Sequence, residues 1–105
     1  MRPANDSLVL RFAEFDLANP DVWRLFERFT FEKIHKGFQH YSADAVLHRV
    51  RWETGTITYD ESSDFKINDH YSCCYARKFR DRYPNHAEFF RLRISQVDAG
   101  WPEAA

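Results

Sequence analysis

The segment from residue 19 to residue 37 constrains the fold most, because both its ends and its apolar spacing specify one amphipathic helix. Asn19-Pro20-Asp21 combines an N-cap residue, a proline at the first helical position and an acid in the first turn, and Gly37 is a typical helix stop. Between these ends, apolar residues recur every three or four positions, at Val22, Leu25, Phe26 and Phe29. The segment is therefore predicted to be a helix with one face in a core.

Two more stretches have helical spacing with recognisable ends. Ser42 is an N-cap residue for a second helix that Gly55 is expected to end, with apolar positions at Ala43, Val46, Leu47 and Val50. Asn68 is expected to cap a third helix over residues 69–82, which Pro84 stops, with apolar positions at Tyr71, Cys74, Tyr75 and Phe79. A capping-box-like sequence at residues 85–88 then predicts a short fourth helix, with Phe89 and Phe90 turned inward.

A change of period between the second and third helices indicates β-structure. Residues 56–59 (TITY) and 65–67 (FKI) are short β-favouring runs, and the DESSD between them has the composition of a turn. The expected fold class is therefore α+β, mostly α, with four helices and a small β-hairpin between helices two and three. This arrangement resembles a winged-helix or helix-turn-helix variant, although the usual winged helix carries its hairpin after the recognition helix.

A chain of 105 residues is expected to form one domain. Its globular part is predicted at residues 19–94, where the helical spacing is clear. Residues 1–18 contain LVLRFAEF, whose partial alternation predicts an edge strand or an ordered arm. Residues 95–105 have no periodicity and are expected to be a loosely ordered tail.

The two cysteines, Cys73 and Cys74, are adjacent, and neighbouring cysteines rarely bond to each other. Free thiols and a reducing compartment are therefore expected. Cys73 precedes Arg77 by one helical turn, and a cationic neighbour lowers the pKa of a thiol. No apolar run approaches the roughly 20 residues that a membrane span needs, and the N-terminus lacks an apolar signal-peptide region, so an intracellular protein with no membrane partner is expected.

Several stretches of the chain resemble a family of small, uncharacterised phage and prophage proteins. They fall within residues 19–93 and read NPDVWRLFERFTFE, HYSADAVLHRVRWET, FKINDHYSCCYARKFRDRYP and FFRLR. The resemblance implies a protein that acts in the cytoplasm of a bacterial host cell. It implies no catalytic residue and no mechanism, but it makes DNA binding, transcription control and interference with host defence reasonable classes of function.

Positive charge is concentrated in and around the third helix. Residues 66–93 contain seven Lys/Arg residues and three acidic ones, whereas the whole chain has a net charge of −1. Such a helix can enter the major groove, where Arg and Lys contact bases and phosphates. The leading hypothesis is a non-enzymatic protein that binds double-stranded DNA through this helix and the hairpin, where Tyr59 is a further backbone contact. The other candidate contacts are Lys66, Asn68, His70, Arg77, Lys78, Arg80 and Arg82.

The outer face of the second helix supports an alternative hypothesis, a protein–protein interface. Trp and Arg are typical anchors of such interfaces. In this case the chain binds a host protein and inhibits or modulates it, as an anti-defence protein does, through His48, Arg49, Arg51, Trp52 and Tyr71. The opposing interpretation places Trp52 in the core and lays the arginine stems over it. The sequence does not distinguish a monomer from a homodimer.

Catalysis and metal binding are not expected. A zinc site needs paired ligands, and the sequence contains no C-x-x-C or H-x-x-x-H pair. Pro20-Asp21 and Asp64-Phe65-Lys66 superficially match the acidic pattern of some magnesium nucleases, but the first of them opens a helix. No Gly-rich phosphate loop or nucleophile elbow is present. The chain is therefore predicted to be non-enzymatic, with no cofactor and no metal.

Overall fold

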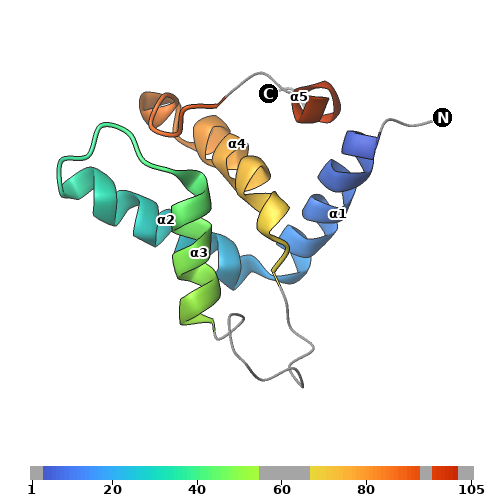
Figure 1. Ribbon diagram of the computed structural model, residues 1–105, viewed down its shortest axis with the longest axis horizontal. Helices are drawn as coiled ribbons and strands as arrows, with labels where there is room; N and C mark the ends of the chain where they lie inside the picture. Colours follow the sequence, from blue (N-terminus) through green and yellow to red (C-terminus); the bar gives the residue numbers. More distant parts are fainter. Residues whose placement is uncertain (1–3, 55–66, 93–95, 102–105) are drawn as a thin grey trace.

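The computed structural model describes residues 4–54, 67–92 and 96–101. Across these ranges the chain forms α-helices and two short 3-10 turns, and Figure 1 shows α4 in the middle with α2 and α3 on one side and α1 and α5 on the other. The elements are α1 (Ala4–Ala18), α2 (Pro20–His35), α3 (Ala43–Glu53), η1 (Asp69–Tyr71), α4 (Ser72–Arg82), η2 (Pro84–His86) and α5 (Gln96–Gly100). The molecule is flat, with extents of 45 × 39 × 20 Å.

The ends of α2 and α3 lie where the sequence places them, apart from Gly55, which is outside the described residues. Gly37 has φ +95, and the backbone N–H groups of Gly37 and Phe38 bond the carbonyls of Ile34 and Lys33, which closes α2 with a left-handed residue. The Ser42 hydroxyl accepts a hydrogen bond from the Ala45 backbone N–H and caps α3. Both boundaries were predicted from local sequence alone, and both are confirmed.

α1 replaces the edge strand or arm expected for residues 1–18. Val9 and Phe12 are buried in the core, whereas Leu10 and Leu17 of the same helix are 49% and 87% exposed. Apolar residues on two sides of one helix produce a pattern that is easily mistaken for alternation. The helix ends because Pro20 disfavours helical backbone at Asn19, whose side chain bonds the Phe15 carbonyl at 3.0 Å instead of capping α2.

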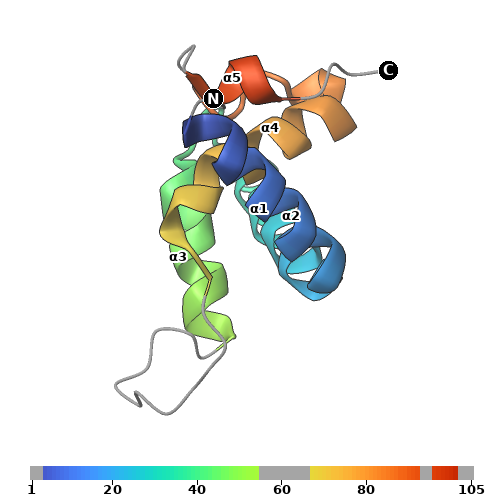
Figure 2. The same cartoon turned by 90° about the vertical axis from the view of Figure 1, so that its right-hand side faces the viewer.

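The core is rich in aromatic rings and is centred on α4. Tyr75 and Phe79 of α4 are fully buried; Tyr75 stacks on Phe26 at 5.2 Å, and Phe79 meets Phe90 edge to face at 5.5 Å. In the turned view of Figure 2, α3 and α1 lie on different sides of the molecule. The residues predicted to share one core are all buried: Phe26, Phe29, Val46, Leu47, Val50, Tyr75, Phe79 and Phe89.

The winged-helix prediction is wrong, because the described part of the chain is helical and contains no strand. Most of the expected hairpin, including Tyr59 and Lys66, lies outside the described residues, and Ile67, its last residue, is buried in the core outside any strand. A recognition helix needs one free face to enter a groove. α4 has little surface of this kind, because it packs against α2 and α3, is joined to α5 and α1 by ion pairs, and buries six of its eleven residues.

The chain after α4 also differs from the prediction. Instead of a fourth helix, η2 forms a single 3-10 turn that begins at Pro84, although Phe89 and Phe90 do turn inward as predicted. The expected loose tail includes α5, whose Val97 is buried against the core. None of the described helices is both long and apolar enough to cross a bilayer.

Candidate functional site

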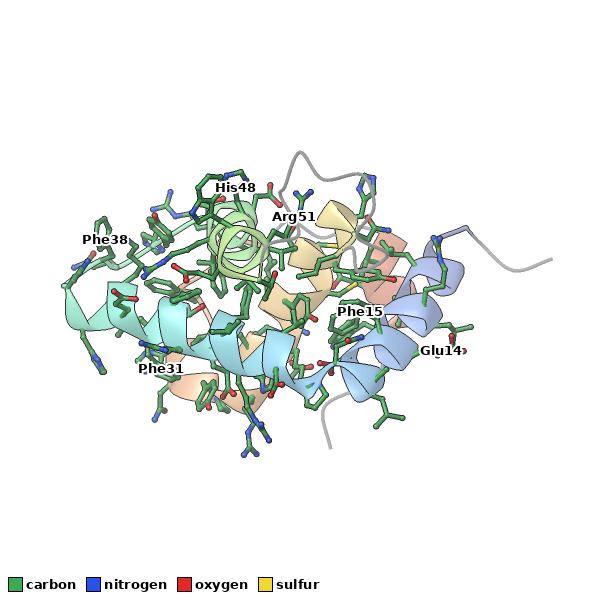
Figure 3. The ribbon with its side chains drawn as sticks, turned by 90° about the horizontal axis from the view of Figure 1, so that it is seen from below. Glu14, Phe15, Phe31, Phe38, His48 and Arg51 are labelled. Carbon is green, nitrogen blue, oxygen red and sulfur yellow. The ribbon has the colours of Figure 1, made fainter. Side chains whose placement is uncertain are left out.

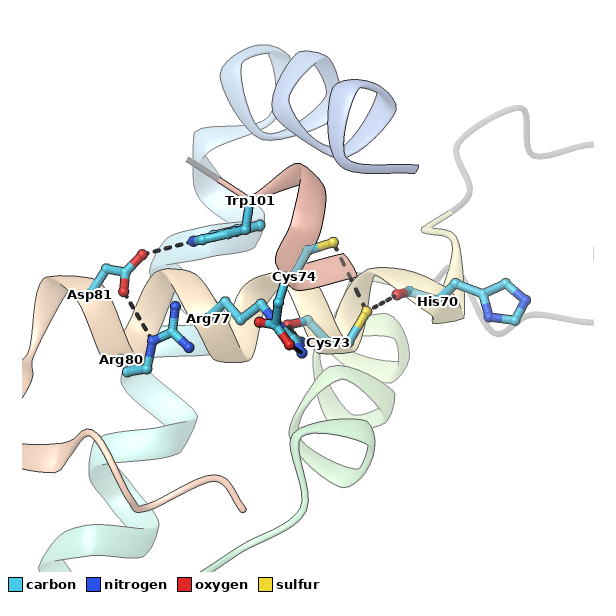
Figure 4. A network of polar contacts seen from close by, with 8 residues as sticks. His70, Cys73, Cys74, Arg77, Arg80, Asp81 and Trp101 are labelled. Carbon is cyan, nitrogen blue, oxygen red and sulfur yellow. Dashed lines mark hydrogen bonds and ion pairs between the residues drawn. The ribbon is translucent and has the colours of Figure 1, made fainter. Parts of the chain in front are cut away.

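Arg77, the central residue of the predicted DNA surface, is an internal residue. Its side chain is 2% exposed, and its guanidinium donates to both carboxylate oxygens of Asp98 at 2.7 and 3.0 Å. A third hydrogen bond reaches the Cys73 carbonyl at 2.9 Å. The bond to Asp98 raises the pKa of Arg77, so the charge is held firmly in this two-pronged geometry. Arg77 therefore fastens α5 to α4 (Figure 4).

Two of the other predicted basic contacts, Lys78 and Arg80, form ion pairs within the chain, although each stays about one-third exposed. Lys78 forms an ion pair with Asp16 of α1 and lies 4.5 Å above the centre of the Trp23 ring. Arg80 bonds Asp81 at 3.0 Å, and the other oxygen of Asp81 accepts a hydrogen bond from the Trp101 indole at 2.8 Å (Figure 4). Both cations thus have a carboxylate beside them already.

The remaining DNA candidates do not form a continuous basic surface. Arg82 is exposed at the end of α4, whereas His70 is exposed near its start, about three helical turns away. Asn68 accepts a hydrogen bond from the His70 backbone N–H at 2.9 Å and so shapes the entry into η1. Lys66 lies outside the described residues. Within the described ranges, the basic residues predicted to share one face are therefore dispersed.

The outer side of α3 is a better exposed surface. Trp52 is 65% exposed, which contradicts the interpretation that places it in the core. Arg49 bonds Glu32 at 2.9 Å and stacks 4.0 Å from the centre of the Phe29 ring, which fixes its position. Figure 3 shows His48 pointing away from α2, and Arg51 on the α4 side of α3. These residues, His48, Arg49, Arg51 and Trp52, are called the α3 face below.

Tyr71, the fifth residue predicted to contact a partner, does not belong to the α3 face. It is 7% exposed and packs edge to face on Phe12 at 5.6 Å. Burial also raises the pKa of its hydroxyl, although Arg11 acts in the opposite direction. Tyr71 is a core residue that joins η1 to α1.

A groove next to the α3 face separates α3 from the start of α4. It consists of two surface pockets of about 580 and 480 Å³, which share a wall made of Asp44, Ser72 and Cys73. The Ser72 hydroxyl donates a hydrogen bond to Asp44 and so joins the two helices at this wall. The larger pocket is also lined by Tyr41, Phe90, Arg91 and Leu92, and the smaller by Leu47, His48, Arg51 and His70.

The two cysteines at this wall have opposite environments. Cys73 is half-buried and lines both pockets, whereas Cys74 is fully buried, and their sulfur atoms lie 4.0 Å apart. A hydrogen bond from the Cys74 thiol and the nearby Arg77 guanidinium lower the pKa of Cys73 to about 6, although partial burial works against them. The same contact, together with burial, raises the pKa of Cys74. Both thiols are free, as predicted.

Sequence reasoning missed three residues that build this region. Asp98 has no local signal, because its partner Arg77 is 21 positions away in a segment without periodicity. Asp44 is an acid in the first turn of a helix, and Ser72 lies near a predicted helix start. The presence of each residue could therefore be explained locally, without a distant partner. Their contact across 28 positions became visible only in the folded chain.

No group of three or more potential metal ligands lies together among the residues that the structure describes. Comparison of the chain with protein-family models, curated proteins and solved structures yields no match. The resemblance to phage and prophage proteins therefore stays a prediction, and the functional argument depends on the α3 face and the groove.

Proposed function

We propose that this chain is a non-enzymatic binding protein that recognises another protein through the α3 face. The observation that carries the proposal is the exposure of Trp52, a large aromatic side chain on the outer side of a well-anchored helix. Trp is among the residues that contribute most to protein–protein affinity when a partner buries it. Its position beside His48 and Arg51 combines an apolar anchor with polar groups that set orientation.

The anchoring of α3 supports this role. Val46, Leu47 and Val50 are buried on its inner side, and Ser42 caps its start, so α3 presents its outer side on a rigid element. Arg49 is held by Glu32 and by the Phe29 ring before any partner arrives. Side chains that are already ordered lose less conformational entropy on binding, which favours affinity.

The charge distribution favours a protein partner over DNA. Affinity for a phosphate backbone comes from cations that can neutralise phosphates. In this fold Arg77 is buried against Asp98, and Lys78 and Arg80 are paired with carboxylates. The net charge of −1 adds no long-range attraction. For three of the residues that the DNA-binding hypothesis named, a phosphate would therefore have to compete with a carboxylate of the same chain.

The chemistry of the α3 face defines the partner. We expect an apolar cleft that accepts the Trp52 indole, flanked by carboxylates that face Arg51 and His48. The resemblance to phage and prophage proteins makes a protein of the bacterial host the one to test first. Such a phage-encoded protein would act in the host cytoplasm.

The test is capture from a nuclease-treated bacterial lysate at low and high salt, with the wild type and two variants. Trp52→Ala removes the anchor, and Leu17→Ala removes an even more exposed apolar side chain on α1 as a matched control. One partner should be retained at both salt concentrations by the wild type and by Leu17→Ala, and its affinity should fall roughly thirtyfold or more in Trp52→Ala. Equal retention by all three proteins would contradict the proposal.

A further inference from the structure

The thiol pair at the wall of the groove is not used by the binding role proposed above. Cys73 borders both pockets, whereas Cys74, the next residue, is fully buried in the core with its sulfur 4.0 Å from that of Cys73. Figure 4 shows the two sulfur atoms in contact with each other and the His70 ring turned away from both, while the Cys73 thiol donates a hydrogen bond to the His70 backbone carbonyl at 3.1 Å. The pair therefore has one thiol that a small molecule can reach and one that it cannot.

We propose that Cys73 is a site of reversible covalent modification by small-molecule disulfides, and that Cys74 takes no part in the exchange. The Cys73 thiolate attacks one sulfur of the disulfide, whose S–S bond breaks as a new S–S bond to Cys73 forms. The other half of the disulfide leaves as a thiolate and takes a proton from water. Cys73 is oxidised, the leaving half is reduced, and a small-molecule thiol in excess reverses the step.

The geometry of the pair explains why the mixed disulfide would persist. A second exchange would need Cys74 to attack Cys73, with the two sulfurs closing to about 2.05 Å. They lie 4.0 Å apart, and adjacent Cα atoms in a trans chain are about 3.8 Å apart, less than the span that most disulfides need. Closing this bond would break the first turn of α4. The same turn buries Cys74, so the core opposes that change.

The two pockets have room for the half that remains on Cys73. Volumes of about 580 and 480 Å³ are in the range of small-molecule sites. The charged and titratable groups around Cys73 lie on several elements: Asp44, His48 and Arg51 on α3, His70 on η1, Cys74 and the Asp98-paired Arg77 on α4, and His40, Tyr41 and Arg91 on the flanking segments. Asp44 is the one acid among these lining groups, and it bonds Ser72. A disulfide that carries carboxylates is therefore preferred to one that carries amines.

The test uses oxidised glutathione, an anionic disulfide, and cystamine, a cationic one, with intact-mass measurement of the native protein. The wild type and Cys74→Ser should each gain one adduct, which dithiothreitol removes, and Cys73→Ser should gain none. For each disulfide, the rate with the native protein is divided by its rate with the urea-unfolded chain. This ratio should be higher for glutathione disulfide than for cystamine. Melting curves of both variants check that each is folded.

The rate supplies a second measurement. Because the pKa of Cys73 is lowered, its thiolate fraction at pH 7 exceeds that of a thiol in the unfolded chain by more than its nucleophilicity falls, so the native thiol should react severalfold faster. The rate should rise with pH and level off above about 6. An adduct on Cys74, a loss of two hydrogens without any adduct, or no native-state reaction would each overturn the proposal.

Discussion

Arg77 and Trp52 show the opposite exposure to that usual for their residue types. Arginine is mostly an exposed residue, and tryptophan is highly buried on average. Here Arg77 is 2% exposed and Trp52 is 65% exposed. Arg77 can be buried because Asp98 and the Cys73 carbonyl accept its hydrogen bonds. A buried charge that keeps its partners is tolerated, whereas one that loses them is strongly destabilising.

Replacement of Arg77 by Gln should therefore act on stability. The variant removes one member of a largely buried ion pair and should lower the free energy of unfolding by about 3 kcal/mol, measured by urea denaturation. The exposed Arg82→Gln is the control and should change it by less than about 0.5 kcal/mol. If Arg77→Gln were as stable as the wild type, Arg77 would be a surface residue, as the DNA hypothesis requires.

At the scale of the elements, the sequence predicted a helix and its buried side correctly wherever one side of the helix is apolar and its ends carry capping or stop residues. α2 and α3 meet both conditions, with Gly37 and Ser42 at their ends. α4 was also predicted, but its outer side was not, since the partner of Arg77 comes from α5. α1 was missed because its apolar residues lie on two sides. For both α1 and the outer side of α4, the local pattern allows more than one structure, and contacts with residues distant in sequence determine which one forms.

The packing of α1 leads to a prediction about Phe12. This ring is 3% exposed and meets Tyr75 edge to face at 4.7 Å. Phe12→Ala should lower the free energy of unfolding by about 3–5 kcal/mol, because it leaves a cavity between α1 and α4. Leu17→Ala, on the exposed side of the same helix, should have little effect. A Phe12→Ala protein with the wild-type melting temperature would mean that residues 1–18 are an arm and not part of the core.

At the scale of the whole molecule, positive charge that is clustered in sequence is dispersed in space. Lys78 meets α1, Arg77 meets α5, and Arg80 meets its neighbour Asp81. A count of charges along the chain cannot reveal this, because two of the three carboxylates come from distant segments. Of the candidate site, the sequence therefore identified the residues of the α3 face but not the exclusion of Tyr71 or the groove beside it.

The central claim is that the basic residues of α4 stabilise the fold and leave recognition to α3. A gel-shift titration with duplex and single-stranded DNA at low salt tests it most directly, with a known DNA-binding protein as the positive control. Micromolar protein should leave both forms of DNA unretarded, although even non-specific binders usually retard DNA under these conditions. Retardation that weakens with added salt, and that Arg80→Gln/Arg82→Gln reduces, would contradict the claim.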